Sequence, residues 1–397
     1  MKLLLKFFLN KIIFFLSIPL RINLFNKNII ILQTYNKNLY CESPKYLYEY
    51  LSKKTNYDVY WVTSNKQIIS YLKKNDLKYI ALKYNPLLFL YVTLNAKIVI
   101  DSGTSYFNPF NLIKSNVIKI TTHHGSGPKN SPTIKFKEIE IENFSKFSFV
   151  NYCSDLSLEQ SGKNLFKLPS ERLIKFGLPR CDQFFDKILV NEKYENKEIL
   201  NYILNNKVTQ NNKIILYTPT WRPYDYDFPL SLMKNFNIES FNKFLEYNNI
   251  YFFYSLHVNS LPNKLPKNYR RIIYIDRNKY PFYDTCEFMN EVDILLNDYS
   301  ATTTDFCLLK RPQIFFLHDY EKYNKYATFT ENYIDCIPGK NISSYEEFIG
   351  LIDTYLSNPS DYNNQFDQKI DSYLKKYYDI KKGDSLELFV NFIKSKI

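Results

Sequence analysis

The sequence predicts an α/β fold with two parallel sheets and a ligand-binding cleft between them. Short apolar runs alternate with helical stretches, which is typical of a parallel sheet covered by helices on both faces. A chain of 397 residues exceeds one ordinary hydrophobic core, so two domains are expected. Residues 187–213 are polar and rich in Asn, Lys and Glu, and the β-α rhythm restarts after them. We therefore place the two domains at residues 28–190 and 191–397.

The strands of both domains are predicted from apolar runs of four to eight residues. In the first domain they lie at residues 28–34, 57–64, 79–82, 97–101, 117–122 and 147–153. Ser43 and Pro44 open a helix after the first strand, with serine as the N-cap and proline at the first helical position. In the second domain the strands lie at residues 213–220, 250–257, 271–276, 292–298 and 312–317, and helices complete the C-terminus.

Residues 1–27 predict a helix that lies in a membrane interface. The apolar run LLLKFFLNKIIFFLSI at residues 3–18 is short for a membrane span and has no signal-peptide cleavage site. At about 100° per residue, most polar residues cluster on one side of this helix, among them Lys2, Lys6 and Arg21. This pattern favours peripheral attachment to the cytoplasmic face of the cell membrane, where the headgroups are anionic. A buried domain helix is the alternative.

The composition favours anionic partners and excludes several kinds of site. The formal net charge is +12, which suits a phospholipid surface, a nucleotide or a phosphate polymer, although a solvated lysine-rich surface explains it equally well. No zinc-finger, helix-turn-helix or RNP pattern supports nucleic-acid binding. No glycine-rich phosphate loop is present, and the six cysteines form no C-x-x-C pair. We expect neither a metal site nor a disulfide framework, no cofactor is firmly implied, and a requirement for Mg²⁺ stays open.

Polar residues follow the predicted strands at the edge where an open α/β sheet binds its ligands. The run HHGSG at residues 123–127 follows one strand, and TPTWR at residues 218–222 follows another. His257 and the run DYS at residues 298–300 end two further strands. The tandem histidines are notable because the chain contains only four histidines. A histidine at this position can take a proton from an attacking hydroxyl near neutral pH.

The segment NDYSATTTDF predicts an anion site at a helix N-terminus. Ser300 is placed to cap a helix over residues 301–310, whose free N–H groups would face a phosphate. Thr302 adds a hydroxyl, and Asp305 one turn later can accept from ligand hydroxyls. Arg222 can bind phosphate through two parallel hydrogen bonds. Plain N-capping and a surface ion pair are the structural alternatives for the serine and the arginine.

Taken together, these segments resemble the CDP-glycerol glycerophosphotransferase family, which builds teichoic acids and related capsule polymers. HHGSGPKN is similar to the family's W-H-G-T-x-x-K segment, and FGLPRCDQFF is similar to its G-x-P-R-x-D segment. ILYTPTWRP, SLHVN and DYSATTTDF match further segments in the same order, so the similarity covers residues of about 29–350. The chain departs from the family pattern at His123 in place of Trp, at Gly127-Pro128 and at Val258.

The resemblance implies a GT-B architecture, with an acceptor domain and a nucleotide-donor domain that are both Rossmann-like. It implies transfer of an alditol phosphate from a CDP-alditol to a hydroxyl of an anionic or glycan polymer, with release of CMP. His124 would be the base, and His257 would be the second catalytic histidine. His123 would be a packing substitute for Trp, and the glycines of the loop would make room for substrate. The donor-binding residues implied are Gly125, Ser126, Lys129, Arg180, Pro219, Thr220, Arg222, Ser300, Ala301, Thr302 and Asp305.

Two other functions are compatible with the same residues. A GT-B capsule glycosyltransferase that uses a CMP- or UDP-sugar would share the cleft and the histidines, but the attack would occur at a sugar carbon. A non-catalytic membrane-bound scaffold with a degenerate nucleotide fold would show no turnover and would tolerate substitution of both histidines.

Overall fold

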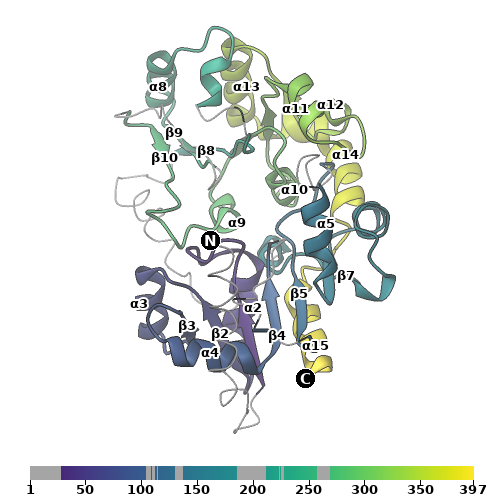
Figure 1. Ribbon diagram of the computed structural model, residues 1–397. Coiled ribbons are helices and arrows are strands. Elements are labelled where there is room, and N and C mark those ends of the chain that lie inside the picture. Colours follow the sequence, from purple (N-terminus) through teal and green to yellow (C-terminus); the bar gives the residue numbers. More distant parts are fainter. Residues whose placement is uncertain are drawn as a thin grey trace, which may run out of the picture.

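The computed structural model describes residues 28–103, 109, 112–113, 115–129, 137–185, 212–222, 224, 228–256 and 269–397. They form two α/β lobes, one above the other in Figure 1. The predicted membrane-interface helix at residues 1–27, the domain boundary near residue 190 and His257 lie outside the described residues. Within the described residues, no helix combines the length and the apolar character needed to cross a membrane.

The first lobe is built on a seven-stranded sheet in which every pair is parallel. Its strands follow the order β3-β2-β1-β4-β5-β6-β7. They are β1 (Ile29–Leu32), β2 (Asp58–Val62), β3 (Tyr79–Ile80), β4 (Ala96–Asp101), β5 (Ile118–Thr121), β6 (Phe149–Tyr152) and β7 (Leu173–Lys175). Each predicted strand of this domain is therefore confirmed, and only the three-residue β7 was not predicted.

The second lobe repeats this plan with a six-stranded parallel sheet in the order β10-β9-β8-β11-β12-β13. Its strands are β8 (Lys213–Tyr217), β9 (Ile250–Tyr254), β10 (Ile272–Tyr274), β11 (Ile294–Asn297), β12 (Gln313–Phe315) and β13 (Lys340–Asn341). In both sheets the first strand lies beside the second on one side and the fourth on the other. This reversal of direction is the switch point at which doubly wound sheets bind ligands, at the carboxyl ends of the strands.

Helices cover both sheets. In the first lobe they are α2 (Glu42–Lys54), α3 (Lys66–Lys74), α4 (Pro86–Asn95), α5 (Lys137–Ser145), α6 (Asp155–Ser157) and the 3₁₀ helix η6 (Pro179–Phe185). In the second lobe they are α8 (Ile238–Tyr247), α9 (Thr285–Met289), α10 (Thr302–Cys307), α11 (Tyr320–Tyr326), α12 (Tyr333–Cys336), α13 (Tyr345–Ser357) and α14 (Pro359–Tyr377). The predicted Ser43 cap is wrong, because α2 begins at Glu42 with Cys41 at the N-cap and no side-chain cap bond.

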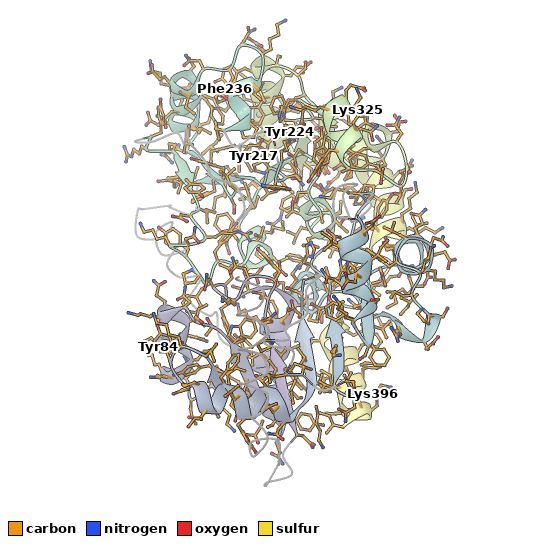
Figure 2. The ribbon with its side chains drawn as sticks, viewed as in Figure 1. Tyr84, Tyr217, Tyr224, Phe236, Lys325 and Lys396 are labelled. Atoms are coloured by element: carbon orange, nitrogen blue, oxygen red, sulfur yellow. The ribbon has the colours of Figure 1, made fainter. Side chains whose placement is uncertain are left out.

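The apolar cores consist of the strands and the inward faces of these helices. Tyr217 of β8, labelled in Figure 2, is fully buried in the core of the second lobe with Phe241 and Phe252. The last helix, α15 (Ser385–Lys396), crosses back and packs against the first sheet through Phe389 and Ile393 (Figure 1). The end of the chain thus belongs to the core of the first lobe, although the sequence-based boundary assigns residues 191–397 to the second domain.

Candidate active site

A cavity of about 630 Å³ lies between the lobes and is lined by residues of both. Tyr35 follows β1 and His124 follows β5, so both reach the cavity from the first lobe. Thr218, Ser255 and Tyr299 follow β8, β9 and β11 and reach it from the second lobe. The two sheets therefore present their carboxyl ends to one space, as the sequence predicts.

The two histidines after β5 are stacked rings with different surroundings. Their ring centroids lie 5.4 Å apart with an interplanar angle of 2°. His123 also stacks on Phe144 at 5.8 Å, and its Nδ1 lies 2.9 Å from the Gly125 carbonyl oxygen. Because a carbonyl only accepts, Nδ1 carries the proton of the neutral His123 ring. His123 has φ 61°, a left-handed conformation that turns the chain so that the His124 side chain is exposed at the cavity.

The pKa of His123 is lowered to about 4, chiefly by burial, while the Gly125 carbonyl opposes this shift and Arg180 adds to it. His123 is therefore neutral at physiological pH and acts as an aromatic surface under His124. This agrees with the packing role implied for the position where the family has Trp. The exposed His124, whose ring lies 6.3 Å from that of Tyr35, is the imidazole that can meet a substrate hydroxyl.

The loop that carries His124 is fixed to the second lobe by hydrogen bonds. Ser126 donates from Oγ to the Tyr377 carbonyl at 2.5 Å, and Thr304 donates from Oγ1 to the Ser126 carbonyl at 2.5 Å. The Thr330 amide donates to the Pro128 carbonyl at 2.7 Å. The hydroxyl of Ser126, predicted to bind the donor, is thus engaged in holding the loop in place.

Gly125 allows this loop to approach the second lobe closely. A Cβ added at Gly125 would lie 2.6 Å from Cβ of Ala301, closer than two carbon atoms pack. The prediction that this glycine makes room for substrate is therefore incomplete, since it first makes room for Ala301.

Lys129 forms an isolated antiparallel bridge with Phe329, and its Nζ lies 3.5 Å from the Tyr323 hydroxyl. Burial lowers the pKa of Lys129, and the nearby Asp298 opposes that shift.

Arg180 connects the histidine loop to the second lobe. Its Nη2 donates to the His124 carbonyl and to Asp305 Oδ2, both at 2.9 Å, and its Nη1 lies 3.8 Å from Glu42 Oε2. Burial disfavours its charged form, but Asp305 and Glu42 outweigh that effect and keep the pKa of Arg180 above its usual value. The geometry makes Arg180 a positioning residue for His124, while its Nε and Nη1 have no hydrogen-bond partner among the described residues.

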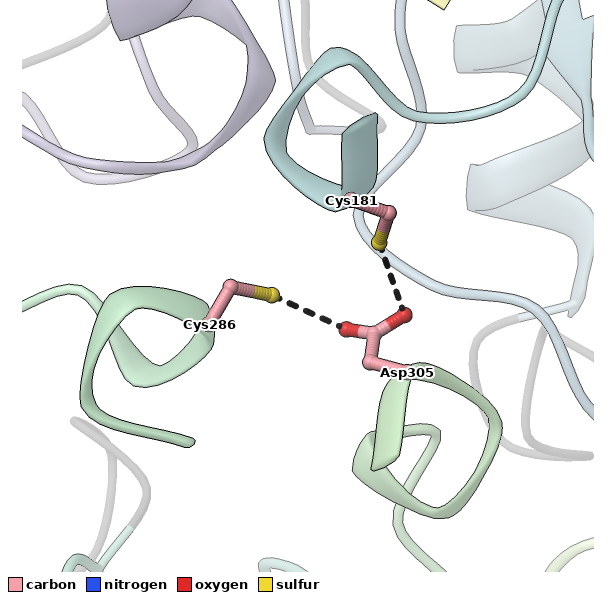
Figure 3. Close-up of side chains that lie close together, drawn as sticks. All are labelled: Cys181, Cys286 and Asp305. Atoms are coloured by element: carbon pink, nitrogen blue, oxygen red, sulfur yellow. Dashed lines mark hydrogen bonds between the residues drawn. The ribbon is translucent and has the colours of Figure 1, made fainter. Parts of the chain in front are cut away.

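Asp305 accepts from donors of two elements, η6 and α9, and Figure 3 shows the two thiols among them. The Cys181 thiol lies 3.5 Å from Oδ1, and the Cys286 thiol lies 3.3 Å from Oδ2. The three ligand atoms lie within 4.8 Å of one another, a grouping that the cysteine spacing did not predict. Burial raises the pKa of Cys286 well above its usual value and that of Cys181 to about 11, so both are neutral thiols near pH 7. Because the Arg180 guanidinium also donates to Oδ2 at 2.9 Å, these contacts describe a carboxylate that accepts several hydrogen bonds.

Arg222 is the predicted site residue whose geometry departs most from expectation. It is 2% exposed and does not line the cavity. Its guanidinium binds Asp319 at 2.6 and 2.9 Å, Asp298 at 2.8 Å and the Thr220 carbonyl at 2.7 Å. Asp298 also accepts from the Thr220 amide at 2.9 Å. Arg222 therefore supports the turn after β8, and its positive charge is already neutralised by two carboxylates.

The hydroxyls after β8 and β11 form one cluster at the cavity wall. Thr218 Oγ1 lies 2.9 Å from Thr302 Oγ1, which donates to Ser300 Oγ at 3.0 Å. The helix predicted over residues 301–310 is only Thr302–Cys307, with Ala301 at its N-cap and no side-chain cap bond. Ser300 as the N-cap is therefore wrong, although its hydroxyl accepts from the Thr302 amide at 3.4 Å.

All predicted site residues line the cavity except Arg222 and His257, the latter being outside the described residues. The cavity also contains residues that the sequence did not single out, notably Tyr35, Glu42 and Arg277. Burial raises the pKa of Glu42 to about 7, while Arg180 opposes the shift. Glu42 has φ 63°, an uncommon backbone conformation for glutamate that only the structure reveals.

Comparison with known proteins agrees with this geometry. Residues 14–395 match the sequence profile of the CDP-Glycerol:Poly(glycerophosphate) glycerophosphotransferase family. A teichoic acid poly(glycerol phosphate) polymerase of Staphylococcus epidermidis is 25% identical over 93% of this chain, which spans only 50% of that polymerase. A teichoic acid glycerol-phosphate primase of Bacillus subtilis is 26% identical, over 78% of this chain and 76% of the primase. The structure of the wall teichoic acid polymerase TagF superposes with a TM-score of 0.71 at 23% identity, covering 92% of this chain and 88% of that one.

Proposed function

Because the chain belongs to the CDP-glycerol:poly(glycerophosphate) glycerophosphotransferase family, we propose that it transfers an alditol phosphate from a CDP-alditol to a hydroxyl of a growing cell-surface polymer. Glycerol phosphate is the expected group, CDP-glycerol the donor and a poly(glycerophosphate) chain the acceptor. The observation that carries the proposal is the family match over residues 14–395, which includes every described wall of the cavity around His124.

In the proposed reaction His124 accepts the proton of the acceptor hydroxyl as its oxygen attacks the β-phosphorus of the donor. A new P–O bond forms to the acceptor, the P–O bond of the diphosphate breaks, and CMP leaves with the electron pair. The His123 ring stacked beneath His124 and the Arg180 bond to the His124 carbonyl support this role, because they hold the ring and the backbone of the proposed base in place. His257 remains a proposed second catalytic residue.

Negative charge that develops on the phosphoryl oxygens needs donors and cations already in place. The hydroxyl cluster of Ser300, Thr302 and Thr218 offers donors at the ends of two adjacent strands. Lys129 adds a cation at the same cavity. We assign the donor diphosphate to this side, with Pro219 and Thr220 as part of its wall.

The test is CMP release from CDP-glycerol or CDP-ribitol in the presence of a short poly(glycerol phosphate) acceptor. His124→Ala is expected to lower kcat by at least about 100-fold, because general-base catalysis contributes about 10²- to 10⁴-fold. His123→Phe is the matched control, since it keeps the ring stacking and is expected to retain activity within about 10-fold. Nucleotide release only from a CMP- or UDP-sugar would replace the proposal with the glycosyltransferase alternative. Unchanged turnover in His124→Ala would remove the assigned base.

We also propose peripheral attachment to the cytoplasmic face of the membrane. Besides the apolar N-terminal run, four apolar side chains around the start of α4 are exposed: Leu82, Tyr84, Leu87 and Leu88. Tyr84 lies at the outer surface of the first lobe (Figure 2), and Leu87 is 71% exposed. Co-sedimentation with anionic vesicles is expected and should weaken in Leu87→Glu. Binding that is equally strong to neutral vesicles, or absent, would contradict this attachment.

A further inference from the structure

The diphosphate of a CDP-alditol carries negative charge, and a site that binds it needs a cation whose charge is not already balanced. Arg222, which the sequence predicts for this role, is paired with Asp298 and Asp319. Arg180 is paired with Asp305. Both guanidinium groups are therefore balanced by carboxylates of the protein, and the charge for the diphosphate has to come from another residue.

Lys129 and Arg277 are the other lysine and arginine side chains that line the cavity among the described residues. Burial lowers the pKa of Lys129, so its surroundings work against its positive charge. Arg277 keeps its charge, because a guanidinium is not deprotonated in proteins. It forms no ion pair with any carboxylate within the part of the chain that the structure describes. Arg277 is therefore the stronger source of positive charge for an anionic ligand.

Arg277 is held by neutral hydroxyl groups. It lies in the connection between β10 and α9, where Nη1 donates to the Tyr35 hydroxyl at 2.7 Å and Nη2 donates to Thr285 Oγ1 at 2.8 Å. Its Nε lies 3.5 Å from Ser255 Oγ, and its Cζ lies 5.5 Å from the centre of the Tyr283 ring. The second N–H group on each Nη has no partner among the described residues, so the oriented guanidinium can donate both to an oxyanion.

The nearby carboxylates are engaged elsewhere. Asp284 accepts from the Glu42 amide at 2.7 Å and from the Cys286 amide at 2.9 Å, the latter as the N-cap of α9. Glu42 lies 3.8 Å from Arg180, and burial raises its pKa to about 7, so it is partly protonated at neutral pH. Neither carboxylate forms an ion pair with Arg277.

Arg277 adjoins the hydroxyl cluster to which the donor diphosphate is assigned. Its neighbour Ser255 directly follows β9, and Thr218 directly follows β8. The last residues of these two strands pair in register, so Ser255 and Thr218 lie about 4.8 Å apart along the sheet edge. Thr218 Oγ1 in turn lies 2.9 Å from Thr302 Oγ1. Because hydrogen bonds of about 3 Å reach inward from both sides, one diphosphate can contact the guanidinium and the hydroxyls together.

We propose that Arg277 binds the diphosphate of the CDP-alditol donor and supplies the positive charge of that site, the role for which the sequence indicates Arg222. The hydroxyl cluster and Arg277 would then hold the same diphosphate from adjacent strand ends. This inference rests on the proposed function and adds to it a donor-binding residue of the second lobe.

The main experiment measures KM for CDP-glycerol and for a poly(glycerol phosphate) acceptor separately in the full chain. Arg277→Gln is expected to raise KM for CDP-glycerol about 10- to 100-fold, the loss expected for hydrogen bonds to a charged group, and to change KM for the acceptor less than about 3-fold. Arg277→Lys keeps the charge without the planar fork of donors and should recover part of the loss. An unchanged KM for CDP-glycerol, or a KM for the acceptor that rises as much, would overturn the proposal.

Lys279→Gln is the matched control, because it removes one exposed positive charge from the same connection outside the cavity. It should leave both KM values within about 2-fold, since a solvated charge contributes little. Thermal unfolding separates binding from a structural role. Without ligand, Arg277→Gln should unfold within about 4 °C of the unmodified protein, because the change leaves no carboxylate buried without its partner. A larger fall in Tm with equal loss for both substrates would identify a structural residue and overturn the proposal.

A second measurement does not depend on turnover. CDP should raise the Tm of the unmodified protein more than cytidine does at the same concentration, because only CDP carries the diphosphate. Arg277→Gln should lose most of this difference and leave the shift caused by cytidine unchanged. If no CMP is released from any CDP-alditol, the proposed function fails, but this comparison still tests Arg277. Equal shifts by CDP and cytidine in the unmodified protein, or a difference that persists in the variant, would refute the assignment.

Discussion

Substitution of Gly125 by alanine tests whether the loop that carries His124, the proposed base, is placed by its contact with the second lobe. Gly125 has no positive φ, so alanine is acceptable to the backbone and the cost is steric. The new Cβ would lie 2.6 Å from Cβ of Ala301, whereas carbon atoms pack at about 3.5–4.0 Å. The loop or the Ser300–Thr302 turn must therefore move by about 1 Å. We expect a loss of about 1–3 kcal/mol in the free energy of unfolding, as for other overpacked sites.

The activity of Gly125→Ala should fall more than its stability suggests, because His124 is the preceding residue. A displacement of about 1 Å at a reacting group can cost about 100-fold in rate. The assays are urea denaturation followed by circular dichroism, and CMP release at saturating CDP-glycerol. Gly127→Ala is the control, because its Cβ would meet only Thr304 Oγ1 and the Tyr373 hydroxyl at 3.5 Å, an ordinary contact.

Ala301→Gly provides the decisive second variant. It removes the atom that collides, so the Gly125→Ala/Ala301→Gly double variant should recover most of the lost stability and activity. Ala301→Gly alone should cost no more than about 1 kcal/mol, the propensity difference between these residues. A Gly125→Ala protein with normal stability and turnover, or a double variant that recovers neither, would show that this contact does not place the loop.

Three further predictions concern the same region. Asp305→Asn should lower the free energy of unfolding by about 3–5 kcal/mol, because Arg180 loses its main counter-ion in a buried site, and a loss below about 1 kcal/mol in urea denaturation would contradict this. Ser126→Ala should cost about 1 kcal/mol through its bond to the Tyr377 carbonyl and leave KM for CDP-glycerol unchanged, whereas a raised KM would favour the donor-binding role predicted from sequence. The pKa of His123 is near its usual 6.5 in the unfolded chain and about 4 in the fold, so the unfolded state binds more protons between these values. Stability should therefore fall as pH drops from about 6.5 to 4, by at most about 3 kcal/mol, and His123→Phe should lose most of this dependence in pH-dependent unfolding curves.

The fold could be predicted from the sequence because its strands are determined by apolar runs of neighbouring residues. Apolar runs such as residues 213–220 and 292–298 give buried parallel strands, and their order along the chain implies the carboxyl-end cleft. The position of His124 at the end of β5 also follows from this pattern. The strands that were missed, β7 and β13, have only three and two residues, too few for a periodicity to be recognised.

The tertiary structure decided which of the polar strand-end residues can face a ligand. Arg222 is 97 residues from Asp319, and Arg180 is 125 residues from Asp305, so no spacing in the sequence shows that these charges are paired. The role of Gly125 likewise depends on Ala301, which lies in the other lobe. Arg277 went unnoticed because its signal is the lack of a carboxylate partner among the described residues, which appears only when the surrounding loops are brought together. Local periodicity therefore fixes the elements and the edge at which ligands bind, whereas charge neutralisation and close packing involve residues far apart in the chain and are determined only by the folded arrangement.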